Sequence, residues 1–218
     1  MILIGFFISI LIILALSSFA FEEKWQVFIK GTQFKQFSIP FIIISTAIIG
    51  FQPEYSSYIL WVGMLMILAA VDLKKKSVRV IDLCLLTLAL VPITVSQHIN
   101  TPMSQFFTIF ISQISITFFI GCGLIALKIL LHAIYKQNAL GGADIWVILT
   151  ILFGMGGIHA IIAIYSAIFY SALIGLIAVI VLKKSRKTQI PFIPFLLMGV
   201  LTSMFFSETI VMLYQSMI

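Results

Sequence analysis

The chain has 218 residues, of which 62% are hydrophobic and only 9% are charged, and its mean hydropathy is +1.23. Soluble domains contain about 25% charged residues, and disordered segments are rich in charge and poor in apolar residues. The composition therefore excludes both classes. It predicts an all-α, polytopic integral membrane protein, because an open sheet would leave its edge amides unsatisfied in lipid.

Eight apolar segments are candidates for transmembrane helices, which need about 20 residues to cross the hydrocarbon layer, so we expect a bundle of about eight such helices. We interpret the first as a retained anchor rather than a cleavable signal peptide, because no basic residue precedes it. The second, third and sixth are short, and we expect them to borrow flanking residues or to lie inside the bundle. In chain order the segments are Ile2–Phe21, Ile39–Phe51, Tyr58–Val71, Ile81–Ser96, Phe106–Leu131, Ile145–Gly156, Ala160–Leu182 and Pro191–Thr209.

The distribution of charge predicts the orientation of these helices. If the N-terminus lies outside and the spans alternate, the inside connections and their helix ends contain all 13 Lys and Arg residues. This is the positive-inside pattern. The net charge of +6 is thus explained by topology, and we expect no nucleic-acid partner. The inside connections are Glu22–Ser38, Asp72–Val80, His132–Asp144 and Lys183–Ile190.

The cysteines and histidines do not form a recognisable site. Cys84 and Cys122 lie in separate apolar runs, without a CxxC pair or a Cys/His cluster. In the predicted topology His98 and His159 fall on the outer side and His132 on the inner side. We therefore expect no disulfide scaffold and no metal site, and nothing in the sequence implies an organic cofactor.

Two aspartates lie at the borders of apolar segments, where placing a carboxylate in the bilayer costs free energy. Asp72 closes the third span, and Asp144 immediately precedes the sixth, after Gly141, Gly142 and Ala143. In the predicted topology both lie at the inner membrane boundary, where ionisable residues are kept mainly to face a cavity, a partner or water.

Two such carboxylates can act together if the fold brings them close. A close pair cannot ionise fully, so it shares one proton. The ionised member can take a proton from water while the neutral member polarises a carbonyl, which is hydrolysis by an aspartic dyad. Isolated interfacial aspartates and a proton-coupled transport pair are the alternatives from these residues.

Three other residues near the same boundary have simpler expected roles. Asp82 begins the fourth span, where its carboxylate would complement the helix N-terminus. We expect Lys128 to extend toward the inner headgroups and Trp146 to act as a packing or anchoring residue.

Three stretches of the chain carry a family resemblance, and together they cover the sequence from about residue 68 to the end. They are Ala70-Val71-Asp72-Leu73-Lys74-Lys75-Lys76, Gly141-Gly142-Ala143-Asp144 and Ile190-Pro191-Phe192-Ile193-Pro194-Phe195. In type, order and spacing they resemble the motifs of the type IV prepilin peptidases, membrane aspartic proteases of the GxGD kind.

The resemblance implies an endopeptidase that removes the basic leader of type IV prepilins or pilin-like secretion subunits. It would cut on the cytoplasmic side of the bacterial inner membrane, just before the hydrophobic helix of the substrate. Asp72 and Asp144 would be the catalytic pair, and Gly141, Gly142 and Ala143 would shape the site or contact substrate.

The chain also differs from the usual family pattern. Val78-Arg79-Val80 stands where a proline-containing motif is usual, Ala143 where a glycine is usual, and Trp146 where a lysine is usual. The connection Glu22–Ser38 has no cysteine-rich insert of the kind that is associated with N-methylation in the family, so we expect the form of the peptidase that lacks the methyltransferase insert.

We expect two parts within the chain. Residues 1–57 would form two helices joined by a short basic cytoplasmic loop, and residues 58–218 would form a six-helix peptidase core. The alternatives to a peptidase are a small proton-coupled transporter and a catalytically degenerate relative that acts in pilus or secretion assembly.

Overall fold

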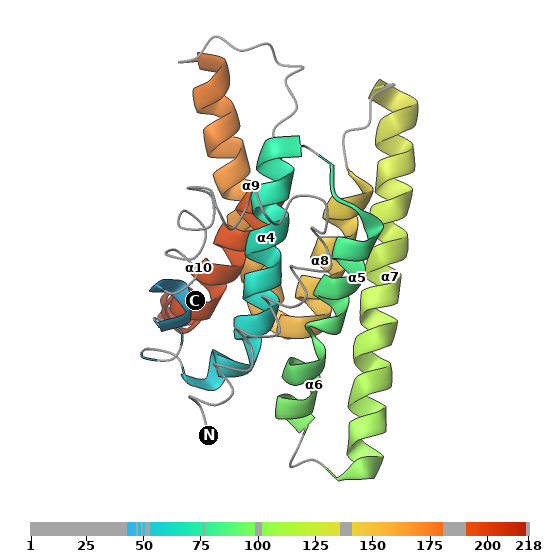
Figure 1. The fold of residues 1–218 in the computed structure, drawn as a ribbon, viewed down its shortest axis with the longest axis vertical. Coiled ribbons are helices and arrows are strands. Elements are labelled where there is room, and N and C mark those ends of the chain that lie inside the picture. Colours follow the sequence, from blue (N-terminus) through green and yellow to red (C-terminus); the bar gives the residue numbers. More distant parts are fainter. Residues whose placement is uncertain are drawn as a thin grey trace, which may run out of the picture.

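The computed structural model of the chain describes residues 43–46, 48, 50, 53–75, 77–98, 102–135, 141–180 and 191–216. The predicted span Ile2–Phe21, the connection Glu22–Ser38 and most of Ile39–Phe51 lie outside the described residues. Within the described ranges every regular element is a helix (Figure 1). In chain order the elements are η1 (Pro53–Tyr58), α4 (Ile59–Lys75), α5 (Val80–Leu88), α6 (Val91–His98), α7 (Met103–Tyr135), α8 (Gly142–Met155), α9 (Gly157–Ile180) and α10 (Ile193–Ser216).

The helices confirm the prediction of a helical membrane protein at the level of length and composition. Five described segments are long and apolar enough to cross a membrane. Helix α8 is shorter, since its 14 residues extend about 21 Å against a hydrocarbon layer of about 30 Å. A total of eight spans with the N-terminus outside stays a prediction. The five segments are Ser56–Leu73, Val80–Gln97, Gln105–Ile134, Gly157–Ile177 and Ile193–Met212.

The fourth predicted span is a bent pair of helices. Helices α5 and α6 are joined by a turn at Ala89 and Leu90. The reason is Pro92, the second residue of α6. It has no N–H to donate to the preceding turn and its ring crowds the carbonyl four residues earlier, so a helix tolerates proline in its first turn but not in its interior.

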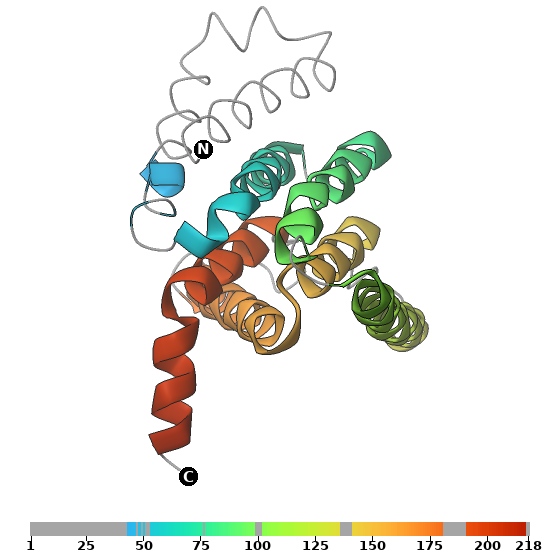
Figure 2. The ribbon, with the colours of Figure 1, turned by 90° about the horizontal axis from the view of Figure 1, so that it is seen from below.

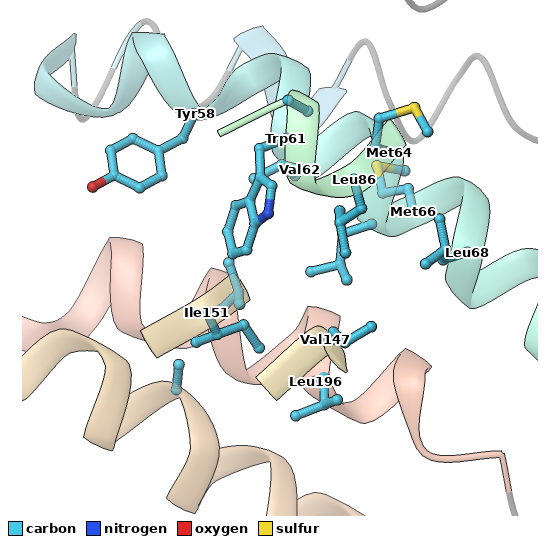
Figure 3. Packing of buried hydrophobic residues seen from close by; sticks show 14 of the residues in the cluster. Tyr58, Trp61, Val62, Met64, Met66, Leu68, Leu86, Val147, Ile151 and Leu196 are labelled. Carbon is cyan, nitrogen blue, oxygen red and sulfur yellow. The ribbon is translucent and has the colours of Figure 1, made fainter. Parts of the chain in front are cut away.

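Helix α8 lies inside the bundle, as expected for a short apolar segment. The large side chains of its inner face, Val147 and Ile151, pack against Trp61 of α4, Leu86 of α5 and Leu196 of α10 (Figure 3). All five side chains are almost completely buried. This cluster joins α4, α5, α8 and α10 in one apolar core.

Helix α7 has a different environment. Its 33 residues extend about 50 Å, and only 6% of its apolar window is buried. It lies at the edge of the bundle beside α8 (Figure 2). We conclude that most of the surface of α7 faces lipid and that one stripe of the helix packs against α8.

Helices α9 and α10 pack closely through Gly199. A Cβ atom at this position would lie 2.0 Å from the carbonyl oxygen of Ala163 and 3.0 Å from the amide nitrogen of Ala167. Both atoms belong to the α9 backbone, which does not move easily. Small residues that let helix backbones approach in this way are common in membrane bundles.

Replacing Gly199 with Ala is expected to destabilise the protein by about 1–3 kcal/mol, because the added methyl group overpacks the contact and separates two helices. Thermal unfolding in detergent measures the effect. Gly123→Ala on α7 is the matched control, since a Cβ there would meet nothing within 4 Å. Equal stability of the two variants would contradict the prediction.

Candidate active site

Four helix ends meet at one end of the bundle, the upper end in Figure 1. Helices α4 and α7 end there, and α5 and α8 begin there. Asp72 lies in the last turn of α4, Asp82 and Asp144 lie in the first turns of α5 and α8, and Lys128 lies seven residues before the end of α7. The fold therefore gathers ionisable side chains from four separate segments in one region.

Asp72 lies in the last turn of α4 and is buried, with 8% of its surface exposed. Its Oδ2 atom accepts a hydrogen bond from the backbone N–H of Ile193, at 3.3 Å. Ile193 is the first residue of α10, so the carboxylate satisfies one of the N–H groups that a helix leaves without an internal acceptor. Two of the three stretches that resemble the prepilin peptidases are thus in direct contact.

Asp144 lies in the first turn of α8 and is partly buried. Its Oδ2 atom accepts a hydrogen bond from the N–H of Gly141, at 3.1 Å. A Cβ atom on Gly141 would lie 2.6 Å from that same oxygen. The first glycine of the Gly141-Gly142-Ala143-Asp144 motif is therefore explained by the close approach of the carboxylate.

The two aspartates interact electrostatically. Asp144 precedes the predicted span Ile145–Gly156, and burial, together with repulsion from the Asp72 carboxylate, raises its pKa to about 6. The hydrogen bond from Gly141 and the charge of Lys128 oppose this and lower the pKa. Two carboxyl groups that lie far apart in the sequence thus repel each other in the fold, and this repulsion favours the protonated form of Asp144.

Asp82 has a partner that the sequence did not suggest. It lies in the first turn of α5, as expected, but its carboxylate forms two bonds of 3.1 Å to the guanidinium group of Arg79. The Asp82 side chain is 6% exposed and the Arg79 side chain 56% exposed. This ion pair satisfies a buried charge within one turn, and we assign it a structural role.

An apolar groove of about 340 Å³ lies among residues of α5, α6, α7 and α8. Trp146, two residues after Asp144, lines it and donates a hydrogen bond from Nε1 to Oγ1 of Thr87, at 3.0 Å. The hydroxyl groups of Thr87, Thr94 and Thr150 donate to carbonyls of their own helices, so the groove presents mainly methyl groups and rings. Its lining comprises Thr87, Leu90, Val91, Thr94, Phe110, Thr117, Trp146, Leu149, Thr150 and Phe153.

Sequence reasoning missed two members of this region. The charge of Lys128 acts on Asp144, a role that was not predicted from the sequence; the extension of Lys128 toward the headgroups stays a prediction. A signal existed, because Lys128 is the single Lys, Arg, Asp or Glu in the sequence of α7. The backbone N–H of Ile193 has no such signal, since its contact with Asp72 depends on how α4 and α10 pack.

Gly141→Ala is expected to reduce hydrolysis by the aspartate pair by about 10- to 100-fold, because the new methyl group displaces the Asp144 carboxylate and small misplacements of a catalytic group are costly. The measurement is kcat/KM on a leader-containing substrate. Gly123→Ala, which adds the same methyl group where no atom lies within 4 Å, serves as the control. Unchanged kcat/KM in Gly141→Ala would show that the close approach has no consequence.

The fold and the site define the class of protein: an all-helical membrane protein with two interacting carboxylates at one end of its helix bundle. Comparisons of the chain with protein-family models, with curated proteins and with solved structures found no match. Among the described residues no group of three or more His, Cys, Asp or Glu side chains is placed to hold a metal ion.

Proposed function

We propose that the chain is a membrane-embedded aspartic endopeptidase of the prepilin peptidase kind. It removes the basic leader of type IV prepilins or pilin-like secretion subunits at the cytoplasmic face of a bacterial inner membrane. The observation that carries the proposal is the electrostatic repulsion between Asp72 and Asp144, which helps to raise the pKa of Asp144. Aspartic peptide hydrolysis usually depends on two carboxyl groups that share one proton, so that one is ionised and the other is neutral.

In this mechanism the pair holds one proton. The ionised carboxylate removes a proton from a water molecule, whose oxygen attacks the carbonyl carbon of the scissile peptide bond. The neutral carboxyl donates a hydrogen bond to the carbonyl oxygen as negative charge develops there. The tetrahedral intermediate then collapses, the C–N bond breaks, and the leaving amine takes a proton from the pair.

The groove lined by Trp146 supports a substrate that has an apolar segment. The groove is lined almost entirely by apolar groups. Such a surface binds an apolar chain by burial and makes few polar contacts. The hydrophobic helix that follows the leader of a prepilin is a chain of this kind.

The direct test is cleavage of a candidate prepilin by the purified protein in lipid nanodiscs. Mass spectrometry reads the loss of the leader and the new N-terminus of the product. We expect cleavage immediately before the hydrophobic helix, and cleavage slower by about 10²-fold or more in a variant that carries both Asp72→Asn and Asp144→Asn. Equal cleavage by this double variant would overturn the proposal.

Two results would favour other functions. Uptake of a solute into proteoliposomes that depends on a pH gradient, without cleavage, would indicate proton-coupled transport. Pilus assembly that needs the chain but is unaffected by Asp144→Asn would indicate a catalytically inactive assembly factor.

A further inference from the structure

Lys128 lies at the aspartate pair rather than at the end of its helix. Seven residues of α7 follow it, which is about 10 Å of helix. Its side chain is partly buried, and its Nζ atom lies 3.7 Å from the position that a Cβ on Gly142 would occupy. The ammonium group therefore lies beside the first residue of α8, two residues before Asp144.

The packing of α7 against α8 fixes this position. The rings of Phe110 and Phe153 meet edge to face with centroids 5.8 Å apart. Further along, a Cβ on Gly121 would lie 3.3 Å from the side chain of Leu149. Positions 110, 121 and 128 differ by 11 and 7 residues, which is close to whole numbers of helical turns. One stripe of α7 thus follows α8 in antiparallel order and ends with Lys128 beside Gly142.

Charged groups from two other helices act on Asp144. Asp72 of α4 repels its carboxylate, and Lys128 of α7 attracts it. Arg79, the residue before α5, and Asp82 of α5 form an ion pair with each other. The positive charge of Lys128 on α7 therefore opposes the effect of Asp72 on the pKa of Asp144.

We propose that Lys128 is a positioning residue of the site, whose ammonium group favours the ionised form of Asp144 and so sets the pH range in which the two aspartates share one proton. An ammonium group placed by helix packing adds a fixed positive potential at the carboxylate. The consequence for peptide hydrolysis rests on the proposed function, whereas the effect on Asp144 itself does not.

The test is labelling of Asp144 by an apolar carbodiimide, a reagent that reacts with protonated carboxyl groups. The full-length protein in nanodiscs is labelled over a range of pH, and modification of Asp144 is quantified by mass spectrometry. In Lys128→Met we expect the midpoint of labelling to rise by roughly 0.5 to 1 pH unit. Lys128→Arg should restore the wild-type midpoint, because it restores the charge.

Two further variants keep the test decisive. Gly142→Val retains the lysine but fills the space beside its ammonium group, so the midpoint should move in the same direction. His132→Gln, one turn beyond Lys128 on α7, should leave the midpoint unchanged. A midpoint that is the same in wild type, Lys128→Met and Gly142→Val would overturn the proposal.

The pH profile of leader removal separates this proposal from the proposed function. If both hold, the profile of Lys128→Met moves upward by the same amount as the labelling midpoint. A shifted midpoint in a protein that cleaves no prepilin would overturn the peptidase and support the role of Lys128. Cleavage with an unchanged profile and an unchanged midpoint would overturn the role of Lys128 alone.

Discussion

Asp72→Asn and Asp144→Asn are each expected to reduce kcat/KM for leader removal by about 10²- to 10⁴-fold, the usual contribution of general acid–base catalysis. Asparagine can neither take a proton from water nor give one to the leaving amine. The two losses should not add in the double variant, because both residues serve one proton-transfer system. Cleavage rates of the single and double variants measure both expectations.

These substitutions can keep the two hydrogen bonds that the aspartates accept from backbone N–H groups. The amide oxygen of asparagine can still accept the hydrogen bond from Ile193 at position 72 or from Gly141 at position 144. We therefore expect both variants to fold, as judged by thermal unfolding in detergent.

The matched control is Asp82→Asn, which changes a third aspartate at the same end of the bundle. Its carboxylate is committed to Arg79, so the variant should retain leader removal within a few-fold of wild type. A loss in Asp82→Asn as large as in the other two would show that cleavage depends on general charge at this end and not on the Asp72–Asp144 pair.

The positions of Asp72 and Asp144 on the helices follow from the sequence. Both border apolar runs next to basic connections, and alternating spans carry both to the same side. The described part of the structure has α4 ending and α8 beginning at one end of the bundle. The alternation of membrane-spanning segments is sufficient to predict that both aspartates lie on the same side.

The bend after α5 has a cause in the sequence, because Pro92 lies within an apolar run. Hydropathy alone does not reveal this bend, since it takes no account of the N–H that proline lacks. The contacts that complete the site are different in kind. The distance of Lys128 from Gly142 and the bond from Ile193 to Asp72 depend on which helix faces pack together. In a chain that is apolar on all sides, periodicity does not mark the buried face of a helix.

The alkaline side of the pH profile is the second large effect that we expect: kcat/KM for leader removal should fall roughly tenfold for each pH unit above about 6. Burial and repulsion from Asp72 raise the pKa of Asp144 to about 6 from the ordinary value of 3.8. A raised pKa means that the pair keeps its proton up to that pH. Above it both carboxylates are ionised, and no acid remains to polarise the scissile carbonyl.

Measurement of kcat/KM between about pH 5 and pH 8 on the wild-type protein tests this slope, and the midpoint belongs to the coupled pair rather than to one residue. Unfolding temperatures over the same range distinguish loss of the proton from loss of the fold. A profile that stays flat or rises above pH 7 would contradict a shared proton. It would mean that Asp72 and Asp144 can both be ionised during turnover, and the acid that assists the leaving amine would then have to come from another group.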